Sequence, residues 1–224
     1  MPDVLVRVVL PDRPGALGAV ASRIGSVGGD VVSIDILERS DGAVVDELGV
    51  VLADEALVEL MTGEILEVDG AAVEAVRRVA SAAVDPRAEL LAVAIGIFHQ
   101  ASADDVLVFL VDRVRARFGA DHVAIVPRPK GRDAPDRTGR AVDAPPGTSV
   151  TGGLPPRLDA GALAAAARGG APDAAVADLA AAGAELVVVR RHPVLRQRER
   201  TRLAELAELA DHRWSELAAR TPVR

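Results

Sequence analysis

The segment LPDRPGALGAVASRIGSVGGDVVSIDI, residues 10–36, joins a strand to a helix and that helix to a second strand. Pro11 ends an apolar run over residues 4–10 that is rich in β-branched side chains and predicts a strand. Gly28 and Gly29 end the helix, as glycine does where a chain needs a positive φ. From Pro14 onward the apolar residues recur at helical intervals, namely at Leu17, Val20, Ala21, Ile24 and Val27. The segment therefore predicts a strand, a turn, a helix with one apolar face, and a strand.

The rest of the first 82 residues also alternates between predicted strands, turns and a helix. Further strands are predicted at 31–39, 44–52 and 72–79, with a second helix at about 54–68 and turns at Asp41-Gly42 and Asp69-Gly70. Ser33 and Asp35 are expected to face outward. The side chains expected to face the core are Val4, Val6, Val8, Leu10, Val32, Ile34, Ile36, Leu48, Val50 and Leu52. The order β-α-β-β-α-β predicts a ferredoxin-like α+β domain over residues 1–82.

Residues 86–224 predict a second, smaller α/β domain. Ser102 and Asp105 form an N-cap signal for one of its helices. Residues 127–157 hold seven of the fourteen prolines and five glycines, which predicts a long loop. The expected elements are helices at 86–100 and 102–119, a strand at 121–127, two short helices within 159–184, a strand at 185–191 and a helix at about 195–219. The last helix has an apolar stripe formed by Leu203, Leu206, Ala210, Trp214 and Leu217.

Composition and charge exclude several classes of protein. The chain has no cysteine, which excludes disulfides, thiolate nucleophiles and zinc–sulfur sites. No apolar run approaches the ~18 residues of a membrane-spanning helix. The N-terminus lacks a secretory signal, so we expect a soluble, cytoplasmic protein that meets no membrane. Residues 1–85 carry 16 acidic and 6 basic residues, a net charge of −10, which disfavours nucleic acid as a partner.

Residues 10–36, and DRPGAL within them above all, resemble an ACT domain, the small ligand-binding regulatory module of amino-acid metabolism. The resemblance covers about the first 80 residues and implies the same ferredoxin-like fold. It also implies a homodimer that senses a free amino acid or a similar metabolite between paired domains. ACT domains that bind amino acids often have an asparagine just before the second strand, where this chain has Asp30. The segment GGDVVSIDI also resembles the ACT segment joined to some malic enzymes.

The turn before the first helix suits a carboxylate independently of that resemblance. Pro14 has the φ of a first helical position and no N–H, and Gly15 lets the backbone approach a ligand closely. The N–H groups of Gly15, Ala16 and Leu17 have no partner within the helix and lie at the positive end of its dipole. Alternatively, Asp12 caps the helix and occupies these amides.

These observations define a candidate ligand site. Asp30 is assigned to the ligand ammonium, and it either retunes the site or marks one that no longer binds; we favour retuning. Val31 and Val32 would form the wall. The ligand carboxylate would lie against Asp12, Arg13, Pro14, Gly15, Ala16 and Leu17.

No set of residues indicates catalysis, a metal or a cofactor. The four histidines, at positions 99, 122, 192 and 212, are scattered and form no pair with metal-ligand spacing. The paired acids Asp46-Glu47 and Asp104-Asp105 fit a strand with alternating faces and a helix start. GTSVTGG, residues 147–153, is expected to be a loop and not a phosphate cradle. The basic stretch Arg190–Arg202 is expected to be a solvated helix start with Arg–Glu pairs.

In residues 86–224, helices are followed by the strand HVAIV, a long loop, the strand ELVVVRR and a closing amphipathic helix. This order resembles, more faintly, a GAF domain, another small-molecule sensor. We therefore expect a non-enzymatic regulatory protein that binds a free amino acid or related metabolite through its ACT-like domain. One alternative is an interaction module whose ACT-like sheet only drives dimerisation, and another is a GAF-type sensor. An enzyme acting through the 127–157 loop and a nucleic-acid binder acting through Arg190–Arg202 are the remaining alternatives.

Overall fold

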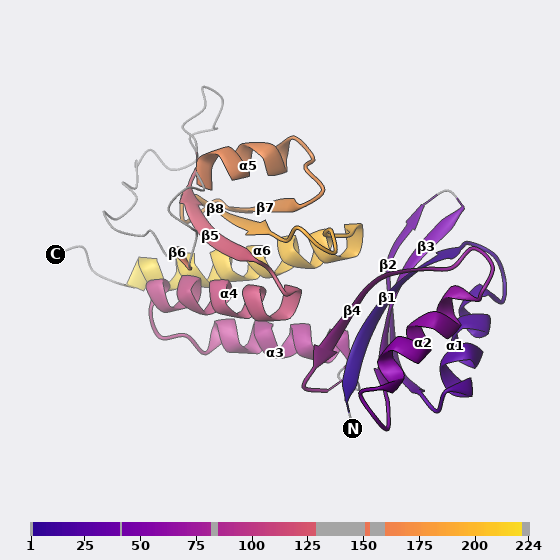
Figure 1. Ribbon diagram of the computed structural model, residues 1–224. Coiled ribbons are helices and arrows are strands. Elements are labelled where there is room, and N and C mark those ends of the chain that lie inside the picture. The colour runs from indigo at the N-terminus through magenta and orange to yellow at the C-terminus, as the bar shows by residue number, and fades with distance from the viewer. Residues whose placement is uncertain (1, 41, 82–84, 129–150, 153–159, 221–224) are drawn as a thin grey trace. The chain divides into compact units, whose positions relative to one another are not determined.

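The computed structural model describes residues 2–40, 42–81, 85–128, 151–152 and 160–220, and the chain divides into two compact units (Figure 1). The first unit comprises Met1–Glu89 with Arg196–Arg198, and the second comprises Leu90–Leu195 with Glu199–Arg224. The second unit is the larger, so the expectation of a smaller second domain is wrong. None of the helices in the described part of the chain is long and apolar enough to cross a membrane.

The first unit has the predicted β-α-β-β-α-β order. Its elements are β1 (Asp3–Pro11), α1 (Ala16–Ser26), β2 (Asp30–Ser40), β3 (Ala43–Val51), α2 (Leu57–Leu66) and β4 (Ala72–Val79). The strands form one sheet in the order β2-β3-β1-β4, and each neighbouring pair is antiparallel. This confirms the ferredoxin-like α+β fold expected for the first 82 residues.

Helices α1 and α2 cover one face of this sheet, and the core lies between the two layers (Figure 1). Ala16, Val20 and Ile24 of α1 and Met61 and Ile65 of α2 are buried in it. The strand residues Val4, Val6, Val8, Leu10, Leu48, Val50 and Leu52 are each at most 2% exposed. These seven positions confirm the predicted alternation along β1 and β3.

Strand β2 departs from the prediction. Ile34 and Ile36 are 49% and 40% exposed, whereas Asp35, expected to face outward, is buried. Ile34 is paired with Leu48, so it does lie on the core side of the sheet as predicted. The side chain is nevertheless exposed because β2 is an edge strand, with a neighbour on one side only among the described strands.

The second unit contains a four-stranded antiparallel sheet, so it is α+β rather than the predicted α/β. Its sheet order is β6-β5-β8-β7. The elements are α3 (Pro86–Phe98), α4 (Ala103–Phe118), β5 (His122–Pro127), β6 (Thr151–Gly152), α5 (Ala160–Arg168), β7 (Ala174–Leu179), β8 (Ala184–Val189) and α6 (Gln197–Arg220). Ser102 caps α4 as predicted, since its hydroxyl accepts a hydrogen bond of 3.1 Å from the Asp105 N–H.

Three layers make up this second unit. Helices α3, α4 and α6 lie on one face of the sheet and α5 lies on the other (Figure 1). The predicted stripe of α6 packs into the larger core through Leu203, Leu206, Ala210 and Leu217, with Trp214 half-buried against it. The amphipathic pattern of this helix therefore packs within its own unit.

The prediction of two short helices within 159–184 is half wrong. Residues Ala160–Arg168 form α5, but Ala174–Leu179 form the edge strand β7, paired along its length with β8. Six residues between glycines, a proline and a turn are too few for a stable helix. Alternate side chains of β7 pack into the larger core, so sheet pairing outweighs the helix propensity of alanine.

The predicted loop over 127–157 cannot be compared in full with the structure. Residues 129–150 and 153–157, and with them most of GTSVTGG, lie outside the described residues. Within the rest, Thr151 and Gly152 form β6, paired with β5.

Candidate functional site

Helix α1 is preceded by a tight turn from Arg13 to Ala16. The Ala16 N–H donates to the Arg13 carbonyl at 3.3 Å, and Gly15 has φ 87° and ψ −10°. These angles are those of the third residue of a type II turn, in which Pro14 is the second residue. The expectation that Pro14 is the first helical residue is therefore wrong: the turn intervenes, and α1 begins at Ala16.

Three backbone N–H groups at the start of α1 have no partner among the described residues. They belong to Gly15, Leu17 and Gly18. The predicted set was Gly15, Ala16 and Leu17, and it is wrong at Ala16, whose N–H is taken up by the turn. Asp12 does not cap the helix, because no side chain within the described residues accepts a hydrogen bond from its start. The alternative in which Asp12 occupies these amides is therefore wrong.

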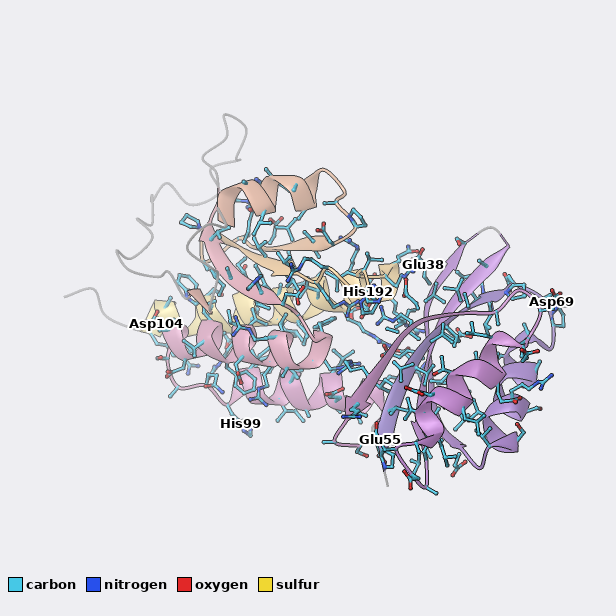
Figure 2. The ribbon with its side chains drawn as sticks, in the orientation of Figure 1. Glu38, Glu55, Asp69, His99, Asp104 and His192 are labelled. Carbon is cyan, nitrogen blue, oxygen red and sulfur yellow. The ribbon has the colours of Figure 1, made fainter. Side chains whose placement is uncertain are left out.

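Two arginines make ion pairs at the turn that precedes α1. Arg13 donates from Nη2 to the backbone carbonyl of Asp69 at 3.2 Å and to its carboxylate at 3.3 Å, and Asp69 lies in the turn before β4 (Figure 2). Arg39 Nε lies 3.8 Å from Asp12 Oδ2. Both arginine side chains are more than half exposed, so each pair contributes under about 1 kcal/mol. An anion that arrives here meets two weakly held guanidinium groups and the positive end of a helix dipole.

The structure does not bring Asp30–Val32 to this place. Asp30 is level with Asp3 at the beginning of β1, whereas the turn follows Pro11 at the end of β1. These two levels are eight residues apart along β1, or about 27 Å at about 3.4 Å per residue. Within one chain the predicted ligand residues therefore form two separate groups.

From the sequence, Asp46 was assigned no role in binding, but this residue is only 3% exposed on β3. Its Oδ1 has no hydrogen-bond partner among the described residues. Burial raises the pKa of Asp46 above its ordinary value; the charge of Arg39 opposes this rise and that of Asp35 adds to it. Asp46 lies two residues before Leu48, so the two side chains are on the same, core-facing side of β3. A carboxylate at a position where the strand alternation predicts an apolar residue is the sequence feature that could have identified Asp46.

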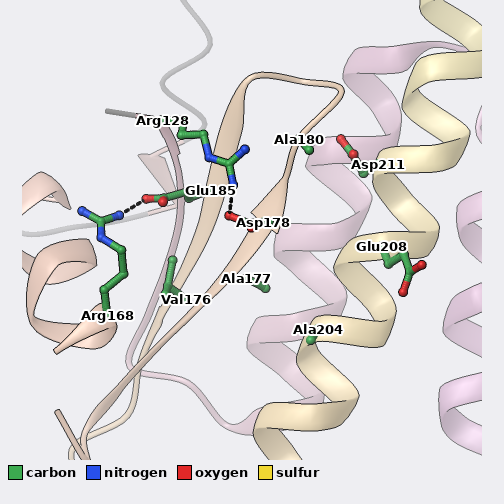
Figure 3. Close-up of a pocket in the computed structure, with 10 residues that line it drawn as sticks. All are labelled: Arg128, Arg168, Val176, Ala177, Asp178, Ala180, Glu185, Ala204, Glu208 and Asp211. Atoms are coloured by element: carbon green, nitrogen blue, oxygen red, sulfur yellow. Dashed lines mark hydrogen bonds and ion pairs between the residues drawn. The ribbon is translucent and has the colours of Figure 1, made fainter. Parts of the chain in front are cut away.

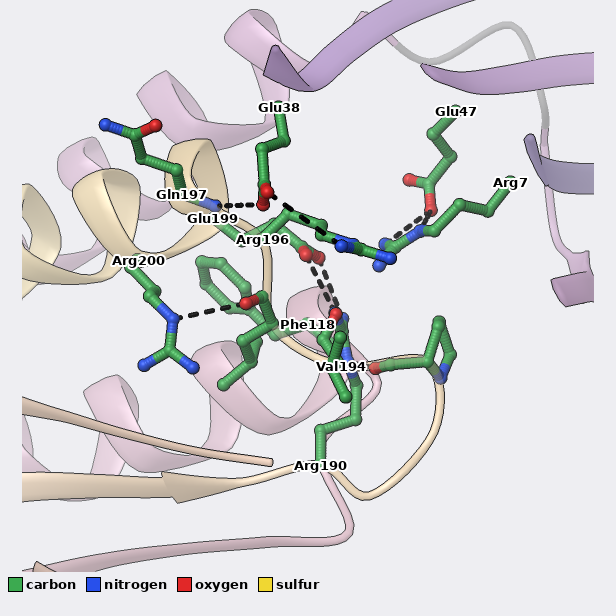
Figure 4. Close-up of polar contacts among 12 residues, drawn as sticks. Arg7, Glu38, Glu47, Phe118, Arg190, Val194, Arg196, Gln197, Glu199 and Arg200 are labelled. Carbon is green, nitrogen blue, oxygen red and sulfur yellow. Dashed lines mark hydrogen bonds and ion pairs between the residues drawn. The ribbon is translucent and has the colours of Figure 1, made fainter. Parts of the chain in front are cut away.

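Glu47, the neighbour of Asp46, lies on the opposite face of the sheet. There its carboxylate accepts a hydrogen bond of 2.9 Å from Arg7, whose side chain is 3% exposed (Figure 4). The predicted alternation of the two acids is thus confirmed. Of the two acids, Glu47 has a cation at hydrogen-bond distance and Asp46 does not.

The histidines form no metal site. Within the described residues no group of three or more His, Asp or Glu side chains is placed to hold a metal ion. His99 and His192 lie far apart in the second unit (Figure 2). His212 lies 3.6 Å from Glu216 in the same helix, as a surface pair.

The basic stretch Arg190–Arg202 contains the predicted Arg–Glu pairing, and Arg191 and Arg198 are exposed as expected of a solvated helix start, but part of the stretch is buried. Arg190 is 4% exposed and makes hydrogen bonds of 2.8 and 2.7 Å to both carboxylate oxygens of Glu199 (Figure 4). It also donates to the carbonyls of Phe118, Pro193 and Val194. Glu199 and Arg202 are buried as well. The buried guanidinium group of Arg190 holds the surrounding loops in place.

The second unit has a cavity of about 900 Å³ around strand β7 (Figure 3). Its charged groups are mostly paired: Arg128 lies 2.7 Å from Asp178, Arg168 contacts Glu185, and Asp211 accepts hydrogen bonds from the turn between β7 and β8. Alanines and Val176 form much of the remaining wall. The described lining thus lacks a nucleophile next to a base, and its charged groups hold the strand edge together.

No family model matches this chain, and no curated protein matches it either. Two solved structures are similar to part of it. A crystal structure of the ACT domain from GTP pyrophosphokinase of Chlorobium tepidum has 16% identity and a TM-score of 0.29, covering 35% of this chain and all of that one. A solution NMR structure of the same domain has 16% identity and a TM-score of 0.28, covering 35% of this chain and 86% of that one. At these values neither likeness assigns a function to the chain.

Proposed function

We propose that the first unit is a regulatory domain that binds a free amino acid or a similar small metabolite, with the ligand carboxylate on the amides at the start of α1. The observation that carries the proposal is the set of three N–H groups, of Gly15, Leu17 and Gly18, that have no partner among the described residues. Such a helix start attracts a carboxylate through its hydrogen bonds and its dipole together. The resemblance of DRPGAL to the ACT domain supports the same ligand class.

The charge distribution of the first unit supports anion binding at the start of α1 and not over its surface in general. Residues 1–85 carry a net charge of −10, so an anion is repelled from most of this surface. Arg13 and Arg39 lie beside the turn, weakly paired with Asp69 and Asp12, and no acidic side chain lies in the first turn of α1. Because these surface pairs are weak, the unpartnered amides and the helix dipole favour a small carboxylate at this place. The protein as a whole is proposed to act by binding, without catalysis.

A second candidate function is self-association through β2, and the exposed pair Ile34 and Ile36 favours it. Apolar side chains on an edge strand are the usual mark of a strand that pairs with another chain. If two β2 strands pair antiparallel, the beginning of one lies beside the end of the other. Asp30–Val32 of one copy would then approach the turn of its partner. This homodimer is compatible with ligand binding and is tested separately below.

The test of ligand binding uses thermal unfolding of the full chain with each of the twenty amino acids. A ligand at 100 times its Kd stabilises the native state by about 2.7 kcal/mol, which moves the midpoint of a domain of this size by on the order of 10 °C. The discriminating variant is Gly18→Pro, which removes one of the three free N–H groups in the first turn, where proline is tolerated. Gly18→Ala keeps that N–H, and its Cβ would meet nothing within 4 Å, so it is the matched control.

We expect one amino acid to stabilise the wild type and Gly18→Ala equally and to stabilise Gly18→Pro much less. An equal shift in both variants would show that the ligand carboxylate lies elsewhere. No shift in the wild type with any amino acid would contradict the proposed function and leave the β2 dimer as the function to pursue.

A further inference from the structure

Asp46 lies on the sheet face that α1 covers. In the ladder between β1 and β3, which has no register shift, Asp46 is paired with Val8 and Leu48 with Val6. Val6, Val8 and Leu48 are all completely buried in the core under the helices. The Asp46 side chain therefore rises from the sheet toward the helix layer.

The level of Asp46 along the sheet follows from a contact at the far end of α1. A Cβ on Gly29 would lie 2.7 Å from the Ile24 side chain and 3.2 Å from that of Leu52, so these two residues mark one level. From Ile24 back to Ala16, α1 rises about 12 Å at 1.5 Å per residue. From Leu52 back to Asp46, the strand covers about 20 Å.

Along the strand direction Asp46 therefore lies beyond the start of α1, on the side toward which the free N–H groups point. Arg39 links the two places, because its charge acts on Asp46 and its Nε lies 3.8 Å from Asp12 in the turn. A ligand that contacts both the amides and Asp46 carries a negative charge at one end and a positive charge at the other. The α-carboxylate and α-ammonium of a free amino acid form such a pair of charges.

The Asp46 carboxylate has no cation at hydrogen-bond distance among the described residues. Arg39 is near enough to act on Asp46 through its charge, but it makes its own contact with Asp12, 3.8 Å away, and is 63% exposed. No donor within the described residues reaches Oδ1 of Asp46. A carboxylate that is 97% buried and lacks a hydrogen bond at one oxygen is costly to keep ionised unless a cation joins it.

We propose that Asp46 accepts the ammonium group of the ligand, so that the site binds an α-amino acid in preference to a carboxylic acid without an amine. This inference rests on the proposed function and names the residue that determines its substrate class. From the sequence, the ligand ammonium was assigned to Asp30, which lies at the other end of the sheet from the turn. We assign it to Asp46 instead.

The experiment is a calorimetric titration of the full chain with two probes. The first is the amino acid that gives the largest thermal shift among the twenty, and the second is its α-hydroxy acid, which has the same carboxylate and side chain without the amine. Asp46→Asn is the test variant, Asp30→Asn tests the rival assignment of the ammonium to Asp30, and Glu59→Gln, on the exposed face of α2, is the matched control. Each substitution removes one negative charge and keeps the size of the side chain.

We expect the wild type, the control Glu59→Gln and the rival variant Asp30→Asn to bind the amino acid at least tenfold more tightly than the hydroxy acid. Asp46→Asn should bind the amino acid at least tenfold more weakly than the wild type, with the affinity for the hydroxy acid unchanged. Asp46→Ala is a second variant with the same expected pattern, and cooperative thermal unfolding establishes that each variant is folded.

Two results would overturn the inference while the proposed function stands. One is an Asp46→Asn protein that still prefers the amino acid tenfold, and the other is a loss of that preference in Asp30→Asn alone. Failure of the wild type to bind either probe would contradict the proposed function itself, and the inference with it.

Discussion

The raised pKa of Asp46 makes the free energy of unfolding of the first unit depend on pH. Burial raises the pKa of this carboxyl, with Arg39 opposing and Asp35 adding to the effect. Well below the ordinary pKa of about 3.9, the group is protonated in the folded and the unfolded chain alike, so it contributes nothing to the pH dependence. As the pH rises, the unfolded chain loses its proton first, so the folded state is progressively destabilised up to the raised pKa.

We expect Asp46→Asn to raise the unfolding midpoint of the first unit at pH 7, because the unpaired buried charge is gone. The difference in unfolding midpoint between Asp46→Asn and the wild type should decrease as the pH is lowered. It should vanish below the ordinary pKa of an aspartate, about 3.9. Thermal unfolding of both proteins between pH 3 and pH 8 measures this. A difference that stays constant over that range would show that the ionised carboxylate is not the cause.

Arg190 and Arg191 are neighbours with opposite surroundings. The ion pair of Arg190 with Glu199 is buried, at 5% and 8% side-chain exposure, whereas Arg191 is 75% exposed in its pair with Asp121. We expect Arg190→Ala to lower the free energy of unfolding by about 3–5 kcal/mol, since it leaves Glu199 buried without its cation. Arg191→Ala should cost under about 1 kcal/mol. Chemical denaturation distinguishes the two, and equal costs would contradict the structural role given to Arg190.

At the scale of elements, α3 and α4 approach closely at Gly96. A Cβ there would lie 2.3 Å from Cζ of Phe109, which is packed against the larger core. We therefore expect Gly96→Ala to destabilise the second unit by about 1–3 kcal/mol despite the higher helix propensity of alanine.

The matched control is Gly25→Ala in α1, where an added Cβ would meet nothing within 4 Å. It should stabilise the first unit by up to about 1 kcal/mol. Phe109→Leu combined with Gly96→Ala should recover part of the lost stability. If Gly96→Ala is as harmless as Gly25→Ala in denaturant unfolding, the two helices are not in close contact at this point.

Strands β2 and β7 show where prediction from the local sequence was incomplete or wrong. The alternation along β2 placed Ile34 on the correct face, but burial also needs a covering layer, and at an edge strand that layer is incomplete. Residues Ala174–Leu179 have a composition that favours a helix, yet pairing with β8 makes them a strand. In both cases the neighbouring element decided the outcome.

At the scale of the whole molecule, each unit has its own core, and the larger core of the second unit shares no residue with that of the first. The exposed edge of β2 offers the first unit a route to self-association, and we expect the full chain to form homodimers through it. Ile34→Lys and Ile36→Lys, made together, should give monomers, because charged side chains on an edge strand oppose pairing.

Analytical ultracentrifugation of the full chain measures this change in mass. Leu60→Lys, which replaces an exposed apolar residue of α2 at 51% exposure, is the control and should remain dimeric. A dimer that survives the double substitution would place the contact elsewhere, and a monomeric wild type would remove the proposal.

The sequence by itself determined the local features of the chain: the inward columns of β1 and β3, the turn at Pro14-Gly15, the Ser102 cap and the stripe of α6. Each depends on residues close in sequence, whose periodicity and backbone preferences are read directly. Only the tertiary structure decided that Asp30 lies at the far end of the sheet from the turn, that Asp46 is buried with no hydrogen-bond partner for Oδ1 among the described residues, and that Arg190 is buried. The physical reason is that register, burial and ion pairing depend on residues far apart in the chain, and these meet only when the sheets and helices pack.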